Sequence, residues 1–224
     1  MNINKMIDHT KLGAAINKAQ IDQLIEEAKT YDFKSVCVNP IWVKYAKHQL
    51  KKTDVLVCTV IGFPHGTHVA AMKAHEAELA VKDGADELDM VINVNALKSK
   101  DYHTTLNEIK AVVEKAEGRT VKVIIETCYL TLEEIEKASL LVVEGGAQFV
   151  KTSTGFGSAG ATVEHVTLMK KTVGEKAFVK ASGGVRTYAD ALKMIEAGAT
   201  RIGTSNGVDI VNQRRNENDT NTSY

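Results

Sequence analysis

The chain is poor in cysteine, proline and aromatic residues, and it has no excess of either charge. Its three cysteines, Cys37, Cys58 and Cys128, are an odd number without close spacing. This argues against a disulfide framework and against a zinc knuckle. Lysine plus arginine and aspartate plus glutamate both total 28, so the formal net charge is zero. The composition therefore gives no indication of a nucleic acid or an anionic membrane surface as a partner.

Long apolar runs are also lacking. No stretch approaches the roughly 20 apolar residues of a membrane-spanning helix. The polar N-terminal sequence MNINKMIDHT shows no signal-peptide pattern. The expected setting is the reducing cytoplasm, where cysteines stay unpaired. Hydrophobic residues still make up 44% of the 224 residues, which is enough for one large core of the size found in α/β barrels.

What the chain does have is an alternation of short apolar runs with longer amphipathic segments. The segments have helical spacing, and the one at 131–146 opens with a capping pattern, Thr131 and Glu134, and closes with two glycines. The runs are apolar on both faces, as parallel strands covered by helices are. Eight runs predict strands, at 5–10, 34–39, 55–63, 87–93, 121–127, 148–153, 177–182 and 200–205.

Eight strand–helix units predict an α/β fold, the (β/α)8 TIM barrel, as one domain over residues 1–213. A doubly wound sheet is the alternative, but the glycine-rich loop that it needs after an early strand is missing. Residues 214–224 are polar and poor in apolar side chains, which predicts a flexible C-terminal tail.

Two lysines occupy matching positions, each at the end of an apolar run. They are Lys151 in QFVKTSTGFG and Lys180 in AFVKASGGVR. Lysine is rarely found at a core position unless it is paired or functional. Two amines that face one cavity would disfavour each other's protonation, and one would be neutral near neutral pH, as a Schiff-base nucleophile must be. The alternative is that both extend to solvent, but the glycines that follow them favour the chemical interpretation.

Further ionisable residues gather at the ends of predicted strands, which form the catalytic face of a barrel. Asp89 interrupts the run ELDMVIN, and by alternation it points away from Leu88 and Met90 and into the barrel. A buried carboxylate needs a cation, which Lys151 or Lys180 would supply. Glu126 is a carboxylate at the same rim without an assigned role.

Three glycine turns follow predicted strands: TGFG at 154–157, SGGVR at 182–186 and IGTSNG at 202–207. The loops after strands seven and eight are the usual phosphate site of these barrels, since backbone N–H groups can approach the anion there. The turns together predict a phosphorylated ligand. Ser205 would donate its hydroxyl, and Arg186 would add positive charge unless it pairs with a surface carboxylate.

The segment GFPHGTH holds His65 and His68, which are spaced as a metal-binding pair can be. No third ligand accompanies them, whereas a metal site normally has three or more protein ligands. The prediction is therefore that the protein uses no metal and no cofactor, and that these histidines cap the next helix or make polar contacts at the rim. Cys37 and Cys58 are expected to be small core residues.

Eight motifs together resemble the deoxyribose-phosphate aldolase family of class I aldolases: IDHTKL, SVCVNP, VIGFPHG, ELDMVINV, KVIIET, FVKTSTGF, VKASGGVR and RIGTSNG. The resemblance extends from Met6 to about Val211. It implies a (β/α)8 barrel that splits 2-deoxy-D-ribose 5-phosphate into acetaldehyde and D-glyceraldehyde 3-phosphate without metal. The expected partners are small phosphosugars and aldehydes, and a homodimer or larger homo-oligomer is a further expectation.

The resemblance also implies roles for single residues. Lys151 resembles the Schiff-base lysine, Lys180 the second lysine that favours its neutral form, and Asp89 the aspartate that works with them in proton transfer. Tyr224 matches a mobile C-terminal tyrosine that assists proton transfer in some members, although its polar surroundings favour a disordered end. Substrate-side and phosphate-site positions are matched by Asp8, Thr10, Gly155, Gly183, Gly184, Gly203, Ser205 and Asn206, the last of which stands where many relatives have a second serine.

Two other functions stay open at this point. A related lyase that acts on a different phosphosugar would use the same lysine and the same glycine loops. A non-catalytic phosphosugar-binding barrel would keep the loops but would have no need of Lys151, Lys180 and Asp89 together.

Overall fold

The computed structural model describes residues 2–213, which form a closed barrel of eight parallel strands in chain order. β1 is hydrogen-bonded to both β2 and β8, so the sheet has no free edge. The predicted (β/α)8 barrel is thus confirmed, whereas the tail at 214–224, with Tyr224, lies outside the described residues. The strands are β1 (Ile7–Lys11), β2 (Ser35–Val38), β3 (Leu56–Ile61), β4 (Glu87–Val91), β5 (Thr120–Ile124), β6 (Phe149–Lys151), β7 (Phe178–Ser182) and β8 (Arg201–Thr204).

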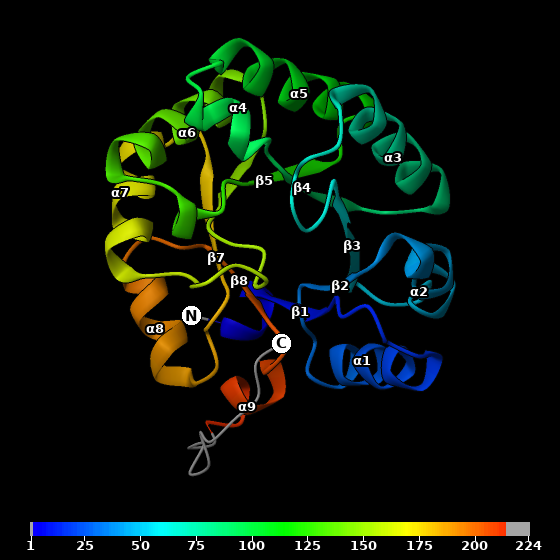
Figure 1. Cartoon of the computed structure of the whole chain (residues 1–224). Coiled ribbons are helices and arrows are strands. Elements are labelled where there is room, and N and C mark those ends of the chain that lie inside the picture. Colours follow the sequence, from blue (N-terminus) through cyan, green and yellow to red (C-terminus); the bar gives the residue numbers. More distant parts are fainter. Residues whose placement is uncertain (1, 214–224) are drawn as a thin grey trace.

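The helices surround the barrel and cover the outer face of its strands (Figure 1). They are α1 (Lys18–Thr30), α2 (Val43–Gln49), α3 (Ala70–Asp83), α4 (Val94–Lys98), α5 (Tyr102–Lys115), α6 (Leu132–Glu144), α7 (Val163–Val173), α8 (Tyr188–Glu196) and α9 (Gly207–Val211). Three short 3-10 turns, at Ile3–Met6, Pro40–Trp42 and Thr127–Tyr129, complete the elements. Among residues 2–213, no helix combines the length and the apolar character needed to cross a membrane.

Local chemistry sets where several helices begin and end. At the start of α6, the Thr131 hydroxyl accepts from the backbone N–H of Glu134, and the Glu134 carboxylate accepts from the N–H of Thr131. This is the predicted capping box. α3 ends at Gly84, whose φ of 100° suits a residue without a Cβ. The N-cap residue of α3 is Val69, which provides no side-chain cap, so the expectation that a histidine of GFPHGTH caps this helix is wrong.

Most strands are shorter than predicted at their C-terminal ends. β4 ends at Val91 rather than 93, and β6 ends at Lys151 rather than 153. β5 ends at Ile124 because Glu126 takes a left-handed conformation, with φ 53°, and turns the chain away from the sheet. The polar residues that follow these strands therefore lie in loops at the barrel mouth, where they can reach a ligand.

The apolar core lies mainly between the strands and the helices. Ile21, Leu24 and Ile25 of α1, for example, are almost completely buried against the sheet. Inside the barrel the filling is different. Branched apolar side chains usually dominate there, but in this protein the interior holds a cluster of charged residues.

Candidate active site

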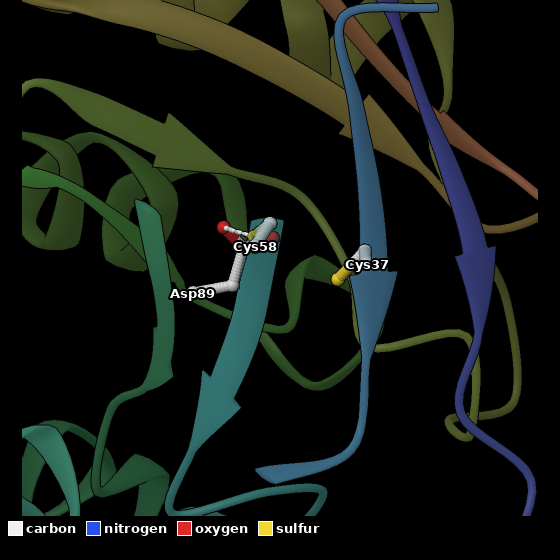
Figure 2. Close-up of side chains that lie close together, drawn as sticks. All are labelled: Cys37, Cys58 and Asp89. Carbon is white, nitrogen blue, oxygen red and sulfur yellow. Dashed lines mark hydrogen bonds between the residues drawn. The ribbon is translucent and has the colours of Figure 1, made fainter. Parts of the chain in front are cut away.

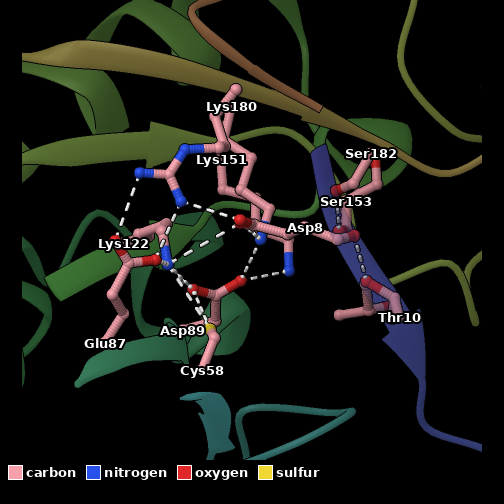
Figure 3. A network of polar contacts seen from close by, with 12 residues as sticks. Asp8, Thr10, Cys58, Glu87, Asp89, Lys122, Lys151, Ser153, Lys180 and Ser182 are labelled. Carbon is pink, nitrogen blue, oxygen red and sulfur yellow. Dashed lines mark hydrogen bonds and ion pairs between the residues drawn. The ribbon is translucent and has the colours of Figure 1, made fainter. Parts of the chain in front are cut away.

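Seven charged side chains fill the middle of the barrel, and we call them the ionic network: Asp8, Glu87, Asp89, Lys122, Lys151, Lys180 and Arg201. None is more than 6% exposed. The strand register brings them together, because Asp89 pairs with Lys122 across β4 and β5. Lys151 likewise pairs with Lys180 across β6 and β7. Residues paired in this way point to the same face of a sheet, here the interior (Figure 3).

Asp89 lies at the centre of the ionic network. Its Oδ2 accepts hydrogen bonds from Lys151 Nζ and Lys180 Nζ, both at 2.7 Å. Its Oδ1 accepts from Lys122 Nζ at 2.8 Å and from Cys58 Sγ at 3.1 Å. Burial alone would raise the pKa of Asp89, but the three lysines hold it well below its usual value. The predicted position of Asp89 inside the barrel is confirmed, and it is an anion.

Lys180 is the most firmly paired of the predicted lysines. Its Nζ contacts Asp8 Oδ2 at 2.5 Å as well as Asp89. Burial would lower the pKa of Lys180, yet the two carboxylates raise it above its usual value. The two amines do not simply face one another, as expected from the sequence, because Asp89 lies between them. Lys180 therefore remains an ammonium ion throughout the neutral pH range.

Three members of the ionic network were missed in the sequence: Lys122, Glu87 and Arg201. Lys122 Nζ lies 2.6 Å from Glu87 Oε2. The Arg201 guanidinium contacts Asp8 Oδ1 at 2.7 Å and both oxygens of Glu87, at 2.9 and 3.1 Å. Lys122 interrupts an apolar run as Lys151 does, so the same rule on buried lysine would have identified it.

A pocket of about 230 Å³ opens above the ionic network. Lys151 lines it and is the network member that borders it, whereas Asp8, Asp89 and Lys180 are fully buried below. We call this cavity the reaction pocket. Five other residues that the sequence predicts at the site also line it: Thr10, Gly155, Gly183, Gly203 and Ser205. The structure thus places an amine and the glycine loops of β6, β7 and β8 around one cavity.

Gly184 and Arg186 do not line the reaction pocket. They border an adjacent hollow of about 380 Å³, which also contacts Gly155 and Gly183. Asn206 lines neither hollow. Its backbone N–H donates to Thr204 Oγ1 at 3.0 Å at the start of α9. The residues expected to hold a phosphate are therefore distributed over two adjoining hollows.

Glu126 organises the loop that follows Lys151. Its carboxylate accepts from the hydroxyl and the backbone N–H of Thr154, a residue of the reaction pocket. Burial raises the pKa of the Glu126 carboxyl, although Thr154 acts in the opposite direction. Glu126 also lines a third hollow, of about 430 Å³, together with His65. His65 and His68 are both exposed, and of the two His65 lines this hollow.

One group within residues 2–213 has the composition of a metal site, namely Cys37, Cys58 and Asp89, whose ligand atoms lie within 4.8 Å of one another (Figure 2). His65 and His68 are not part of it. Both oxygens of Asp89 already accept from lysine ammonium groups, so a cation would have to displace one. The two cysteines are buried, as expected, but inside the barrel next to Asp89 rather than in the helix-covered core.

A family model and the sequences of known proteins both match this chain to the same group of aldolases. Residues 3–213 match the model of the DeoC/LacD family aldolase. A deoxyribose-phosphate aldolase from Carboxydothermus hydrogenoformans is 61% identical over 213 residues, which is 93% of each chain. One from Acholeplasma laidlawii is 55% identical over 224 residues, the whole of both chains.

Solved structures agree in fold. A structure described as a putative deoxyribose-phosphate aldolase from Coccidioides immitis has a TM-score of 0.93 and 45% identity, and the match covers 94% of this chain and 85% of that one. A tetrameric deoxyribose phosphate aldolase from Aeropyrum pernix has a TM-score of 0.88 and 30% identity, over 94% and 89% of the two chains. On these matches and on the lysine-lined pocket, the chain belongs to the DeoC/LacD aldolase family.

Proposed function

We propose that this protein is a class I aldolase that reversibly cleaves 2-deoxy-D-ribose 5-phosphate into acetaldehyde and D-glyceraldehyde 3-phosphate. The observation that carries the proposal is Lys151, an amine that borders the reaction pocket and contacts the buried Asp89–Lys180 pair. Relatives that are 55–61% identical to this chain are named deoxyribose-phosphate aldolase.

The proposed chemistry starts with attack of Lys151 Nζ on the C1 aldehyde, and loss of water leaves an iminium ion. The C2–C3 bond then breaks as the C3 hydroxyl loses its proton, and the electron pair moves into the iminium to give an enamine. Protonation of the enamine at C2 and addition of water release acetaldehyde. A covalent amine makes the cleavage possible because it accepts the electrons that would otherwise form a carbanion.

The charges of the ionic network support Lys151 as the nucleophile. Three carboxylates, Asp8, Glu87 and Asp89, face four basic groups, so one base is in excess. Lys180 bridges two carboxylates, whereas Lys151 contacts one, Asp89, which it shares with other lysines. Loss of a proton from Lys151 therefore leaves no carboxylate without a cation, and the free amine can attack.

Asp89 and Lys180 are proposed to carry protons to and from the reacting atoms. Lys180 is held as an ammonium by Asp8 and Asp89, so it keeps a proton beside Asp89 throughout the neutral pH range. The chain Lys180–Asp89–Lys151 is joined by hydrogen bonds of 2.7 Å and ends at the pocket. General acid–base catalysis requires this kind of short contact.

The phosphate is proposed to lie against the glycine loops of the two adjoining hollows. Gly155 and Gly183 have positive φ values, 88° and 78°, and border both of them. Without side chains at these positions, backbone N–H groups can approach an anion closely. Ser205 and Arg186, one in each hollow, would add a hydroxyl and a positive charge.

Release of acetaldehyde from deoxyribose 5-phosphate, measured beside unphosphorylated deoxyribose and a ketose bisphosphate, tests the proposal. Lys151→Met serves as the matched inactive variant. Faster turnover of the ketose bisphosphate would favour the related-lyase alternative. Tight binding of phosphosugars with no turnover and no imine would favour a non-catalytic binding barrel.

The same proposal includes the cellular compartment, the size of the substrates and the oligomeric state. All three cysteines are free thiols, which suits a reducing compartment such as the cytoplasm. The balanced charge suits small substrates rather than nucleic acid. Assembly into a homo-oligomer is proposed because the Aeropyrum pernix relative is tetrameric.

A further inference from the structure

Cys37 and Cys58 are direct neighbours in the strand register of β2 and β3. Both side chains point into the barrel and are fully buried (Figure 2). The Cys58 thiol also contacts Asp89, with Sγ 3.1 Å from Oδ1. Two thiols thus lie together beside the carboxylate that we assign to proton transfer.

The positions of the two cysteines suit a covalent bond between them. Neighbouring strands are about 4.8 Å apart, and a disulfide joins Cα atoms that are roughly 4.4–6.8 Å apart. The backbone therefore need not move. Each sulfur lies within 4.8 Å of the other, and rotation of the side chains would bring them into contact.

The two thiols differ in how readily they ionise. The neighbouring Cys58 side chain lowers the pKa of the Cys37 thiol. Burial raises the pKa of the Cys58 thiol well above its usual value. The thiolate is the reactive form of cysteine, so Cys37 is the sulfur that attacks an oxidant first, and Cys58 is the partner that resolves the product.

We propose that Cys37 and Cys58 form a redox modification site, at which a peroxide converts the two thiols into an intrachain disulfide and thereby slows turnover. The Cys37 thiolate attacks one peroxide oxygen, so that an S–O bond forms, the O–O bond breaks and the other oxygen leaves as water after protonation. Cys58 then attacks the Cys37 sulfur, and a second water leaves as the S–O bond breaks. Two thiols and one hydrogen peroxide give one disulfide and two waters.

The disulfide would change the surroundings of Asp89 directly. Cys58 would lose the proton that it donates to Oδ1, and its sulfur would turn toward β2. Lys122 Nζ, which lies 3.4 Å from Cys58 Sγ, would lose that contact too. The formal charge of the barrel interior would stay the same, and the change would be in the geometry around the proton-transfer group.

A small oxidant has a short route to the site. Cys37 and Cys58 share an apolar cluster with Leu12, with Phe63 packed against it. Leu12 also lines the reaction pocket. The thiols are therefore one side-chain layer from the cavity that we propose receives the substrate.

The test treats the native protein with hydrogen peroxide, blocks the remaining thiols with an alkylating agent and maps the peptides without reduction. We expect the peptides that contain Cys37 and Cys58 to be joined, with the mass of two hydrogens lost. Turnover should fall by about fivefold or more, the usual scale for loss of one hydrogen bond to a charged group. A dithiol reductant should restore both thiols and the activity.

Three variants serve as controls, each compared by its ratio of treated to untreated activity. Cys37→Ser and Cys58→Ser should give ratios near one, and Cys128→Ser should respond as the parent does. Free Cys37 and Cys58 after treatment would overturn the proposal, as would a joined pair without loss of activity. The effect on turnover rests on the proposed aldolase activity, but peptide mapping reports the bond even if that activity is absent.

Discussion

Lys151 and Lys180 are paired in register on β6 and β7, and their amines contact the same oxygen atom, Oδ2 of Asp89, each at 2.7 Å. One carboxylate oxygen thus joins the lysine that borders the pocket to a lysine that stays protonated. A proton that leaves Lys151 has Asp89 as its acceptor, whereas Lys180 also contacts Asp8, at 2.5 Å. The lysine that we propose as the nucleophile and the lysine that stays protonated are therefore distinct residues.

The first prediction concerns the imine. Borohydride added with acetaldehyde should place an ethyl group on the peptide that contains Lys151, because this amine borders the pocket. Lys151→Arg should show no labelling and no turnover, since a guanidinium stays protonated and cannot attack. Peptide mapping by mass spectrometry gives the answer. An ethyl group on Lys180 or Lys122 would reverse the assignment.

The second prediction locates the phosphate. Gly184 has φ 78° and open space around its missing Cβ, so Gly184→Asp and Gly184→Asn carry the same strain and differ by one charge. We expect kcat/KM for deoxyribose 5-phosphate to be lower in the aspartate variant by about tenfold or more, because like charges repel. Unphosphorylated deoxyribose should not distinguish the two variants.

The matched pair Ser205→Asp and Ser205→Asn probes the other hollow, since Ser205 lines the reaction pocket and Gly184 does not. A charge effect at Ser205 alone would place the phosphate in the reaction pocket. Equal effects on both sugars at both positions would show that the phosphate binds elsewhere.

The third prediction concerns Lys122, which is fully buried between Glu87 and Asp89. Lys122→Met should lower the free energy of unfolding by about 3–5 kcal/mol, the usual cost of leaving buried charge unpaired. Adding Glu87→Gln removes one carboxylate with the lysine, so the double variant should be more stable than the sum of the single changes predicts. Urea denaturation of all four proteins gives the coupling energy. A loss below about 0.5 kcal/mol for Lys122→Met would contradict tight pairing.

The fourth prediction concerns the stability of the protein at low pH. Burial raises the pKa of Asp8, but Lys180 and the other cations hold it below its ordinary value of 3.8. A carboxyl whose folded pKa is lowered adds stability above 3.8, and that stability is lost as the pH falls below it. The parent should therefore lose more stability than Asp8→Asn between about pH 5 and about pH 3. Urea titrations at both pH values measure this, and parallel losses in the two proteins would refute it.

The fifth prediction is that no metal is required. Among the described residues, Cys37, Cys58 and Asp89 form the one group that could bind a metal ion, and Asp89 is already occupied by lysines. Dialysis against EDTA should leave kcat unchanged. A loss that a single divalent ion reverses would show that the expectation is wrong.

Much of the architecture follows from the sequence because parallel strands buried on both faces leave a clear apolar signal. Asp89, Lys151 and Lys180 were identified because each places a charge within or at the end of such a run, and the structure brings all three together. The register of β4 explains why the alternation of side chains along the strand correctly predicts that Asp89 points inward. Its neighbours Leu88 and Met90 face the helices.

Glu87 and Arg201 could not be found in the same way. Each is the first residue of its strand, where a charged side chain ordinarily meets solvent. Their burial depends on closure of the sheet, which brings Arg201 to Asp8 across 193 positions of sequence. The left-handed turn at Glu126 was also missed, since no glycine or asparagine marks it.

Arg201 connects the last strand of the barrel to Asp8 in the first strand and to Glu87 in the fourth. As the chain leaves the ribosome, both carboxylates emerge long before this guanidinium. A partial barrel that lacks β8 would have to bury Asp8 and Glu87 without this guanidinium, and a buried carboxylate that lacks a hydrogen-bond partner costs free energy in desolvation. The hydrogen bonds of these two carboxylates are thus complete only in the closed barrel, when β8 is in place.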